Sequence, residues 1–392
     1  MTEIKGLLQG LITALPMMVS MFWAAVIALD IRHDGNRAAH RELFWWTVAT
    51  ALLYACHVVF FAHALTWLPL SDTLYVAMNL AVYPAFLYYI LTLTRGEVSK
   101  KTKISLLLPP PLCGAIVGLL YALMSSDECR QFIHTYLYNN SFSGLAGLCL
   151  AQALVHHLCK LLFGVGVVLV YFCAKRNIRA YHRLVDNVYA DEEGKKLHSV
   201  SLIMTLMMAI TVISIVANII GRHVFVENAA LAIPSLLFSM LIFALAWTGS
   251  RQQYGFADIK EVHEEPAADM QDNAETAPPP DGQGESRTPN TCGKAQELAV
   301  RIDRLMDDEQ LYLVSGLKVS DLAQRLNTNV RYIQQALNEE LNMSFAEYVN
   351  RRRVAHAAKL QNQYPGIDIL TLSVKSGFAS ITSYYRNVKK YS

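Results

Sequence analysis

Charged residues are scarce in this 392-residue chain up to about Trp247. Asp, Glu, Lys and Arg make up 17% of the whole sequence, against about 25% in typical soluble domains, and hydrophobic residues make up 53%. This composition favours an integral membrane protein. A soluble protein with seven buried helices is the weaker alternative, because buried helices of soluble proteins rarely run this long without charges.

The sequence also lacks the spacings that metal sites and catalytic centres require. We find no HxxH, HExxH or CxxC spacing and no nucleophile placed with a base. The last apolar run, Ala229–Trp247, contains no lysine, which argues against a retinal Schiff base in its usual place. We therefore expect no enzyme activity, no cofactor and no metal.

Cysteine is infrequent and forms no recognisable framework. Most of the seven cysteines lie in apolar runs, where they are typical small core residues. Cys129 and Cys149 alone are placed to meet in a connection outside the membrane, where an oxidising compartment would permit a disulfide.

What the chain does contain is seven long apolar runs. A bilayer core of roughly 30 Å is crossed by about 20 helical residues, and each run is near that length. The runs lie near residues 6–30, 43–67, 72–94, 104–124, 152–174, 200–220 and 229–249. We expect the first run to remain as a span, because Met1–Lys5 lacks the positive charge of a signal peptide. Residues 1–253 are thus predicted to form a seven-helix transmembrane sensor region.

Basic residues are sorted between alternate loops. One set of loops carries Arg32, Arg37, Arg41, Arg95, Lys100, Lys101, Lys103, Lys175, Arg176, Arg179, Arg183, Lys195 and Lys196. The other set carries essentially Arg130 and Arg222. Because basic loops stay in the cytoplasm, we expect a multi-pass protein of the inner membrane, with its N-terminus outside and its C-terminus cytoplasmic.

A few ionisable side chains fall in the outer halves of the predicted spans. His57 and His63 lie in the second, and His156, His157 and Lys160 in the fifth. Ionisable groups at membrane depth suggest a function, here an anionic ligand site, a pH sensor or a metal site. The alternative is that Lys160 snorkels to the interface and the histidines bond neighbouring helices.

The apolar pattern stops in residues 254–295. Asp258–Glu285 holds nine carboxylates and one lysine, interspersed with proline and glycine. Such a composition is typical of a flexible tether. It would leave a domain at 296–392 free to reorient.

Helical spacing resumes after Gln296. Leu298, Ile302 and Met306 share one face of a first helix, and residues 317–326 give a second. We expect Asn327 in the left-handed turn that ends this second helix, and Thr328 as the N-cap of the next. Helix, tight turn and helix form a first DNA-reading unit.

The third helix of this unit is predicted to present polar side chains outward. Its apolar residues Ile333, Leu337 and Leu341 recur every four positions, so the residues between them face away from the core. The outward residues are Arg331, Gln334, Gln335 and Asn338. Arginine, glutamine and asparagine are the side chains that read base edges in the major groove.

A long linking helix and a second unit follow. A capping box at Ser344–Glu347 opens the linking helix, which carries Arg351, Arg352 and Arg353. We expect Arg351 and Arg353 to contact phosphates, with a buried ion pair as the alternative. The apolar residues Ile367, Leu370 and Val374 predict a short helix, Gly377 a turn and residues 380–391 a second recognition helix.

This stretch resembles the DNA-binding domain of the AraC family of transcription regulators. The matching residues are Leu322-Ala323, Tyr348 through Arg353, Ser376 through Ser380, Tyr384-Tyr385-Arg386 and Lys389-Lys390. The resemblance implies two helix-turn-helix units that read successive major-groove segments, with base contacts from Arg331, Gln334 and Gln335 and from Thr382, Tyr385 and Arg386. We add Lys389 as a DNA contact. Val388 departs from the family, which has a core aromatic there, and the sequence ends at Ser392 where members of the family continue.

The expected fold is all-α, with a seven-helix membrane bundle and a cytoplasmic double helix-turn-helix. The expected function is a one-component transcription regulator in which the bundle senses a signal and the domain binds DNA. Expected partners are double-stranded DNA, the lipid bilayer, RNA polymerase and an unidentified small-molecule or envelope signal, and a homodimer is left open. The alternative is a membrane transporter or receptor whose degenerate C-terminal domain binds a protein partner.

Overall fold

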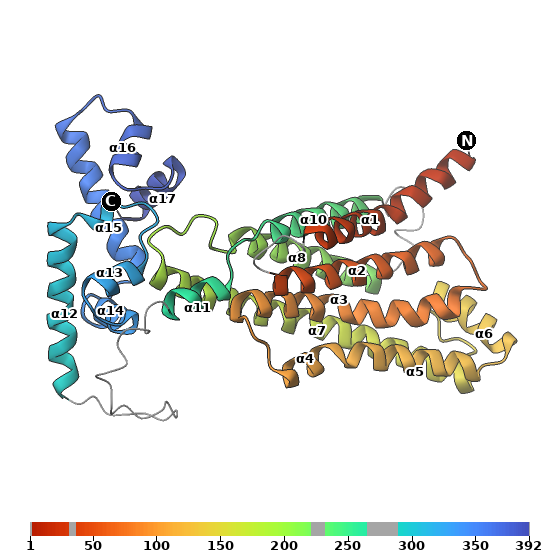
Figure 1. Ribbon diagram of the computed structural model, residues 1–392. Helices are drawn as coiled ribbons and strands as arrows, with labels where there is room; N and C mark the ends of the chain where they lie inside the picture. The colour runs from red at the N-terminus through yellow and green to blue at the C-terminus, as the bar shows by residue number, and fades with distance from the viewer. Residues whose placement is uncertain (1, 31–36, 221–231, 265–288, 392) are drawn as a thin grey trace. The chain divides into compact units, whose positions relative to one another are not determined.

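The computed structural model describes residues 2–30, 37–220, 232–264 and 289–391. Its named elements are all helices, which confirms the all-α prediction for these residues (Figure 1). The chain divides into two compact units. Unit 1 contains Met1–Arg179 and Leu197–Gln253, and unit 2 contains Ala180–Lys196 and Tyr254–Ser392.

Unit 1 is built from long apolar helices. They are α1 (Thr2–Asp30), α2 (Arg37–Phe61), α3 (Leu68–Arg95), α4 (Lys100–Leu107), α5 (Pro109–Leu123), α6 (Ser126–Phe132), the π-helix η1 (Ile133–Tyr138), α7 (Gly147–Val188), α8 (His198–Ile220) and α10 (Ala232–Ser250). Six helical stretches of the described residues could cross a membrane by length and composition, with α4 and α5 together forming one of them.

The count of six differs from the seven expected spans at one place. The predicted span at 200–220 corresponds to α8, but the apolar stretch found among its described residues, His198–Ile213, is shorter than a full crossing. The basic loop residues Arg32 and Arg222 lie outside the described residues.

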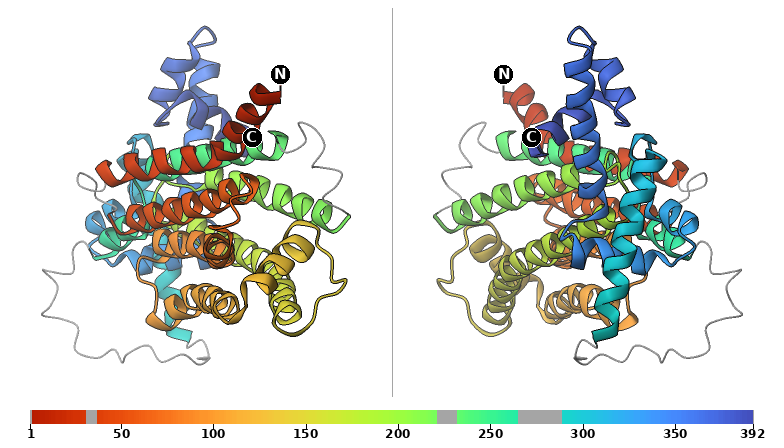
Figure 2. Two further views of the ribbon diagram at one scale, coloured as in Figure 1. Left: turned by 90° about the vertical axis from the view of Figure 1, so that its right-hand side faces the viewer. Right: turned by 90° about the vertical axis from the view of Figure 1, so that its left-hand side faces the viewer.

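The helices of unit 1 pack in a largely sequential order. α1, α2 and α3 lie side by side, α5 lies against α3, and α10 packs on α1 and α8 (Figure 2). Gly114 permits the approach of α5 to α3, because a Cβ there would lie 2.8 Å from the Cβ of Ala77. Large aliphatic and aromatic side chains such as Leu119, Leu161 and Phe172 remain exposed, as expected of helices that face lipid.

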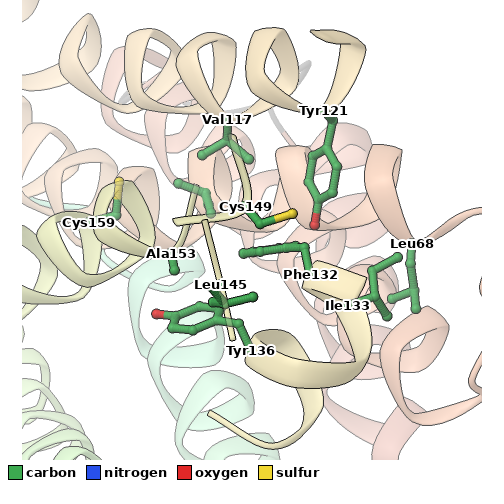
Figure 3. Close-up of a cluster of buried hydrophobic side chains, with 11 residues drawn as sticks. Leu68, Val117, Tyr121, Phe132, Ile133, Tyr136, Leu145, Cys149, Ala153 and Cys159 are labelled. Atoms are coloured by element: carbon green, nitrogen blue, oxygen red, sulfur yellow. The ribbon is translucent and has the colours of Figure 1, made fainter. Parts of the chain in front are cut away.

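One buried cluster links α3, α5, η1 and α7 at one end of the bundle. Tyr121, Phe132, Tyr136 and Cys149 converge in it (Figure 3). Phe132 and Tyr136 come from the short helices α6 and η1, which the sequence pattern did not predict. These helices cover polar groups that α3 and α7 contribute.

Helix α7 supplies residues to both units. It is a single helix of 42 residues, about 63 Å long at 1.5 Å per residue. The predicted span at 152–174 covers only its middle. From Ala180 onward the helix and the loop after it belong to unit 2.

Unit 2 contains two long helices, α12 and α15, and several short ones. They are α11 (Phe256–Glu264), α12 (Pro289–Asp308), the 3-10 turn η3 (Leu311–Leu313), α13 (Val319–Arg325), α14 (Val330–Gln335), the π-turn η4 (Ala336–Glu340), α15 (Phe345–Gln363), α16 (Ile369–Lys375) and α17 (Ile381–Tyr391). Within the expected tether at 254–295, residues 256–264 lie in α11 and residues 289–295 lie in α12. Residues 265–288 of it lie outside the described residues.

Local predictions in unit 2 have mixed outcomes. Asn327 has φ 49°, which confirms the left-handed turn. Thr328 is not the N-cap of α14, because the side chain of Asn329 accepts the hydrogen bond from the Arg331 backbone N–H over 2.9 Å. The short helix predicted from Ile367, Leu370 and Val374 is present as α16, although Leu370 and Val374 are 59% and 62% exposed and Leu372 fills the core.

Candidate DNA interface and polar cluster of the bundle

The first helix-turn-helix presents the predicted base-reading side chains at different exposures. Ile333 and Leu337 are fully buried, and Arg331 and Asn338 are exposed. Gln335 Nε2 donates to Glu339 Oε2 over 3.1 Å. Gln334 Nε2 donates to the backbone oxygen of Asn187 over 3.1 Å, so this side chain already has a partner within unit 2.

The second helix-turn-helix depends on a glycine at its turn. Gly377 has φ 81°, and a Cβ there would lie 2.6 Å from the carbonyl oxygen of Tyr312. Phe378 and Tyr384 then pack into a core with Leu372, and Val388 is partly buried against it. The missing aromatic at Val388 therefore does not prevent core formation.

Helix α17 exposes one polar face. Thr382, Tyr385, Arg386 and Lys389 are all exposed, and their spacing places them along one side of the helix. The hydroxyl of Ser380 accepts a hydrogen bond from the Ser383 backbone N–H over 3.0 Å, which caps the N-terminus of α17. These four side chains are exposed, and their contact with a DNA groove stays a prediction.

The three arginines of α15 have three different environments. Arg351 is exposed and pairs with Glu347 over 2.8 Å, so it remains a candidate phosphate contact. Arg352 joins α15 to α12 through Asp303 and Asp307, each 2.5 Å away. Burial opposes the charge of Arg352, but the neighbouring Tyr348, Asp303 and Asp307 raise its pKa.

Arg353 is completely buried, and this corrects its prediction as a DNA contact. Its guanidinium donates to Asp191 Oδ1 over 2.7 Å, to Tyr312 O over 2.6 Å and to Val314 O over 2.8 Å. Burial lowers the pKa of the Arg353 guanidinium, and the Asp191 carboxylate opposes this shift. The alternative of a buried ion pair is therefore the one observed, and Arg353 acts by holding the loop before α13.

Residues 322–392 match a family model described as "Helix-turn-helix domain", which is of the AraC type. The C-terminal domain is an AraC-type helix-turn-helix domain. No curated protein and no solved structure matched the chain.

The AraC-type domain is packed with a segment from far upstream in the chain. Residues 180–196 lie in the same compact unit, and Asp191 is 5% exposed. Its second carboxylate oxygen accepts a hydrogen bond from the backbone N–H of Gly316 over 2.5 Å. Sequence reasoning missed Asp191, since nothing local distinguishes it from the other acids of a polar loop.

A second polar site lies inside unit 1. His156 Nε2 is 2.7 Å from Asp72 Oδ2, and both side chains are 6% exposed. Tyr121 donates its hydroxyl to the same carboxylate oxygen over 2.8 Å, and His156 Nδ1 lies 2.8 Å from the carbonyl oxygen of Gln152. The Asp72 carboxylate thus joins α3, α5 and α7. Its position at the edge of an apolar run was the signal that could have identified it.

His157 and Lys160 belong to a neighbouring, more exposed group. The hydroxyl of Tyr136 lies 2.7 Å from His157 Nδ1, and Lys160 Nζ donates to that hydroxyl over 3.2 Å. Lys160 also donates to Asn140 Oδ1 over 3.2 Å and lies 4.9 Å from the centre of the Tyr136 ring. The structure thus brings together the three predicted polar residues of α7 around η1.

His57 and His63 pack against aromatic rings of α2, α3 and η1. The ring of His57 packs on Tyr54 and Tyr75, with centroids 5.2 and 5.1 Å away. His63 has φ 51° and packs on Tyr138 at 4.8 Å.

Cys129 and Cys149 are both free, so the structure does not contain the predicted disulfide. Cys149 Sγ instead donates to the carbonyl oxygen of Glu128 over 3.3 Å. Within the described part of the chain no group of three His, Cys, Asp or Glu side chains is arranged to hold a metal ion.

Proposed function

We propose that this chain is a membrane-integrated one-component transcription regulator. Its helical bundle would lie in the inner membrane with the AraC-type domain in the cytoplasm, where DNA is accessible. The domain would bind double-stranded DNA through Arg331, Gln334, Gln335 and Asn338 of the first unit and through the exposed face of α17. Lipid-exposed apolar helices and the sorting of basic loops support membrane insertion.

The continuity of α7 carries the proposal. One helix begins beside the buried Asp72–His156 pair and ends in the unit that contains the AraC-type domain. A helix that supplies residues to both units is the proposed covalent route by which a change at the signal site alters the AraC-type domain.

The polar groups around α7 are the proposed signal site. Asp72, His156 and Tyr121 form its buried part, and the exposed His157 and Lys160 reach the buried hydroxyl of Tyr136 beside it. Burying an ionisable group in a membrane helix costs free energy, so the groups that are found there usually have a function. Their presence here supports a sensing role. The signal would be a small molecule or an envelope condition that alters these hydrogen bonds.

One observation favours the alternative of a transporter. Paired intramembrane charges are typical of transporters, and Asp72 and His156 form such a pair. A transporter would keep its substrate flux when the AraC-type domain is removed, whereas a regulator has no such flux to keep.

The proposal is tested by joining two measurements on the full chain in cells. Formaldehyde crosslinking and sequencing should recover a few discrete genomic sites with the tagged chain. The same chain should resist alkaline extraction from the membrane pellet. Arg331→Ala should lose the genomic sites and stay in the pellet. A membrane-embedded chain that crosslinks to no discrete site would contradict the proposal.

A further inference from the structure

The end of α7 and the loop that follows it contact both DNA-reading units. We call residues 186–196 the connector segment. In the first helix-turn-helix, Gln334 Nε2 donates to the backbone oxygen of Asn187. Just before it, the backbone N–H of Ala190 donates to Leu317 O over 3.1 Å. Tyr189 and Lys318 form an isolated antiparallel bridge beside them. The connector segment thus occupies the side-chain amide of Gln334, which was predicted to read a base.

In the second helix-turn-helix, the connector segment contacts the start of the recognition helix α17. Ser380 Oγ donates to Glu193 Oε2 over 2.5 Å, at the N-cap of α17. The carboxylates of Glu192 and Asp186 also attract the ammonium group of Lys390 near the end of α17. Burial lowers the pKa of Lys390, but Tyr391 and these two carboxylates raise it overall.

The position of the Glu193 carboxylate has a chemical meaning. Helix N-termini and hydroxyl side chains are among the groups with which DNA-binding proteins contact phosphate oxygens. The Glu193 carboxylate is thus an anion bound to a hydroxyl at a helix N-terminus, the kind of group that contacts phosphate oxygens in DNA complexes. Glu193 and the Asn187 carbonyl therefore act on groups that DNA would need.

Asp191 lies between these two contacts and fixes the connector segment. Its carboxylate is buried against Arg353, and Asn350 Nδ2 donates to Ala190 O over 2.9 Å. Because buried ion pairs are costly to break, this part of the segment stays bound. The Asn187 carbonyl and the Glu193 carboxylate, on either side of Asp191, are then held near Gln334 and Ser380 at high effective concentration.

We propose that the connector segment is a built-in competitor of DNA. Its Glu193 carboxylate occupies the Ser380 hydroxyl at the N-cap of α17, its Asn187 carbonyl occupies the Gln334 amide, and operator DNA must displace both. This inference rests on the proposed function, because it assigns the regulation of the same DNA interface. Movement of α7 would change how firmly the competitor is held and so change operator affinity.

The test compares two acidic residues in the full chain, solubilised in detergent. Glu193→Ala should bind operator DNA about tenfold more tightly than the unaltered chain, which corresponds to about 1.4 kcal/mol. Glu297→Ala is the matched control, because Glu297 is exposed on α12 and its replacement also removes one negative charge from unit 2. Equal affinities of the two variants would overturn the proposal.

A reversible lock gives a second test. In Glu193→Cys/Ser380→Cys, a short cleavable thiol crosslinker should join the connector segment to α17. The crosslinked chain should lose operator binding and regain it after cleavage, with the unaltered chain treated in parallel. Binding that is unaffected by the crosslink would overturn the proposal. If no chain prefers operator over scrambled DNA, the proposed function fails as well.

Discussion

Arg353 Nη1 and Asp191 Oδ1 form an ion pair of 2.7 Å between residues 162 positions apart, with the side chains 0% and 5% exposed. Arg353 lies on α15 of the AraC-type domain, and Asp191 lies in the loop after α7. The pair makes a segment from the middle of the chain an integral part of the DNA-binding unit.

Removing the carboxylate should destabilise unit 2. Asp191→Ala leaves the buried Arg353 charge without a partner, which costs roughly 3–5 kcal/mol in comparable cases. Arg351→Ala removes an exposed pair with Glu347 and should cost only about 0.2–1 kcal/mol. Thermal unfolding of the detergent-solubilised chain, followed by proteolysis of unit 2, measures both. Similar losses in the two variants would mean that the buried pair contributes little.

The sequence predicted the helices of both units better than their connections. Apolar spacing located the long helices and the two readers, since amphipathic periodicity is a local property. Asn327 was predicted correctly for the same reason, because a left-handed turn is favoured by asparagine itself. The short helix predicted at α16 is present, but its spacing did not show which side faces inward, since Leu370 and Val374 are exposed while Leu372 and Phe378 fill the core.

Long-range pairing was beyond the sequence pattern. Arg353 stands in an arginine triplet, and nothing near it distinguishes a buried side chain from a phosphate contact. Its partner Asp191 lies in a polar loop. Asp72 lies at the edge of an apolar run, and its partner His156 is on another helix. Such pairs depend on tertiary packing, which periodicity and capping signals do not encode.

Asp72 and His156 should act as one unit in signalling. Asp72→Asn and His156→Gln should each alter signal-dependent transcription, and the double variant should be no worse than the stronger single one, because each removes the same interaction. A reporter gene downstream of the operator measures the response, with protein level and in vitro DNA affinity as controls. His57→Gln is the matched comparison, since the ring of His57 packs on Tyr54 and Tyr75. Additive effects of Asp72→Asn and His156→Gln would refute the coupling.

Membrane topology should follow the charges of the loops. A reporter fused after Lys101 should read cytoplasmic, and one fused after Ser126 should read external, because the first loop is basic and the second is not. Paired alkaline phosphatase and fluorescent protein fusions measure this. A cytoplasmic signal after Ser126 would reverse the proposed orientation.

Arg331 should contribute to sequence preference as well as to affinity. Its exposed guanidinium on α14 can pair with one guanine, so Arg331→Ala should cost roughly 1–3 kcal/mol and relax preference at one base pair. Titration against a set of single-base operator variants measures both effects. An equal loss on all sequences would instead assign Arg331 to a phosphate.

The central claim, that a chain with membrane-spanning helices reads DNA through its AraC-type domain, is tested most directly by binding-site selection from random DNA. The full chain should be used in detergent, because residues 180–196 complete the unit that contains the domain. We predict an enriched sequence with two conserved segments about one helical turn, roughly 10 base pairs, apart, one for each helix-turn-helix. Binding should also weaken steeply with salt. Recovery of no enriched sequence after repeated rounds, from a chain that remains folded, would contradict the account.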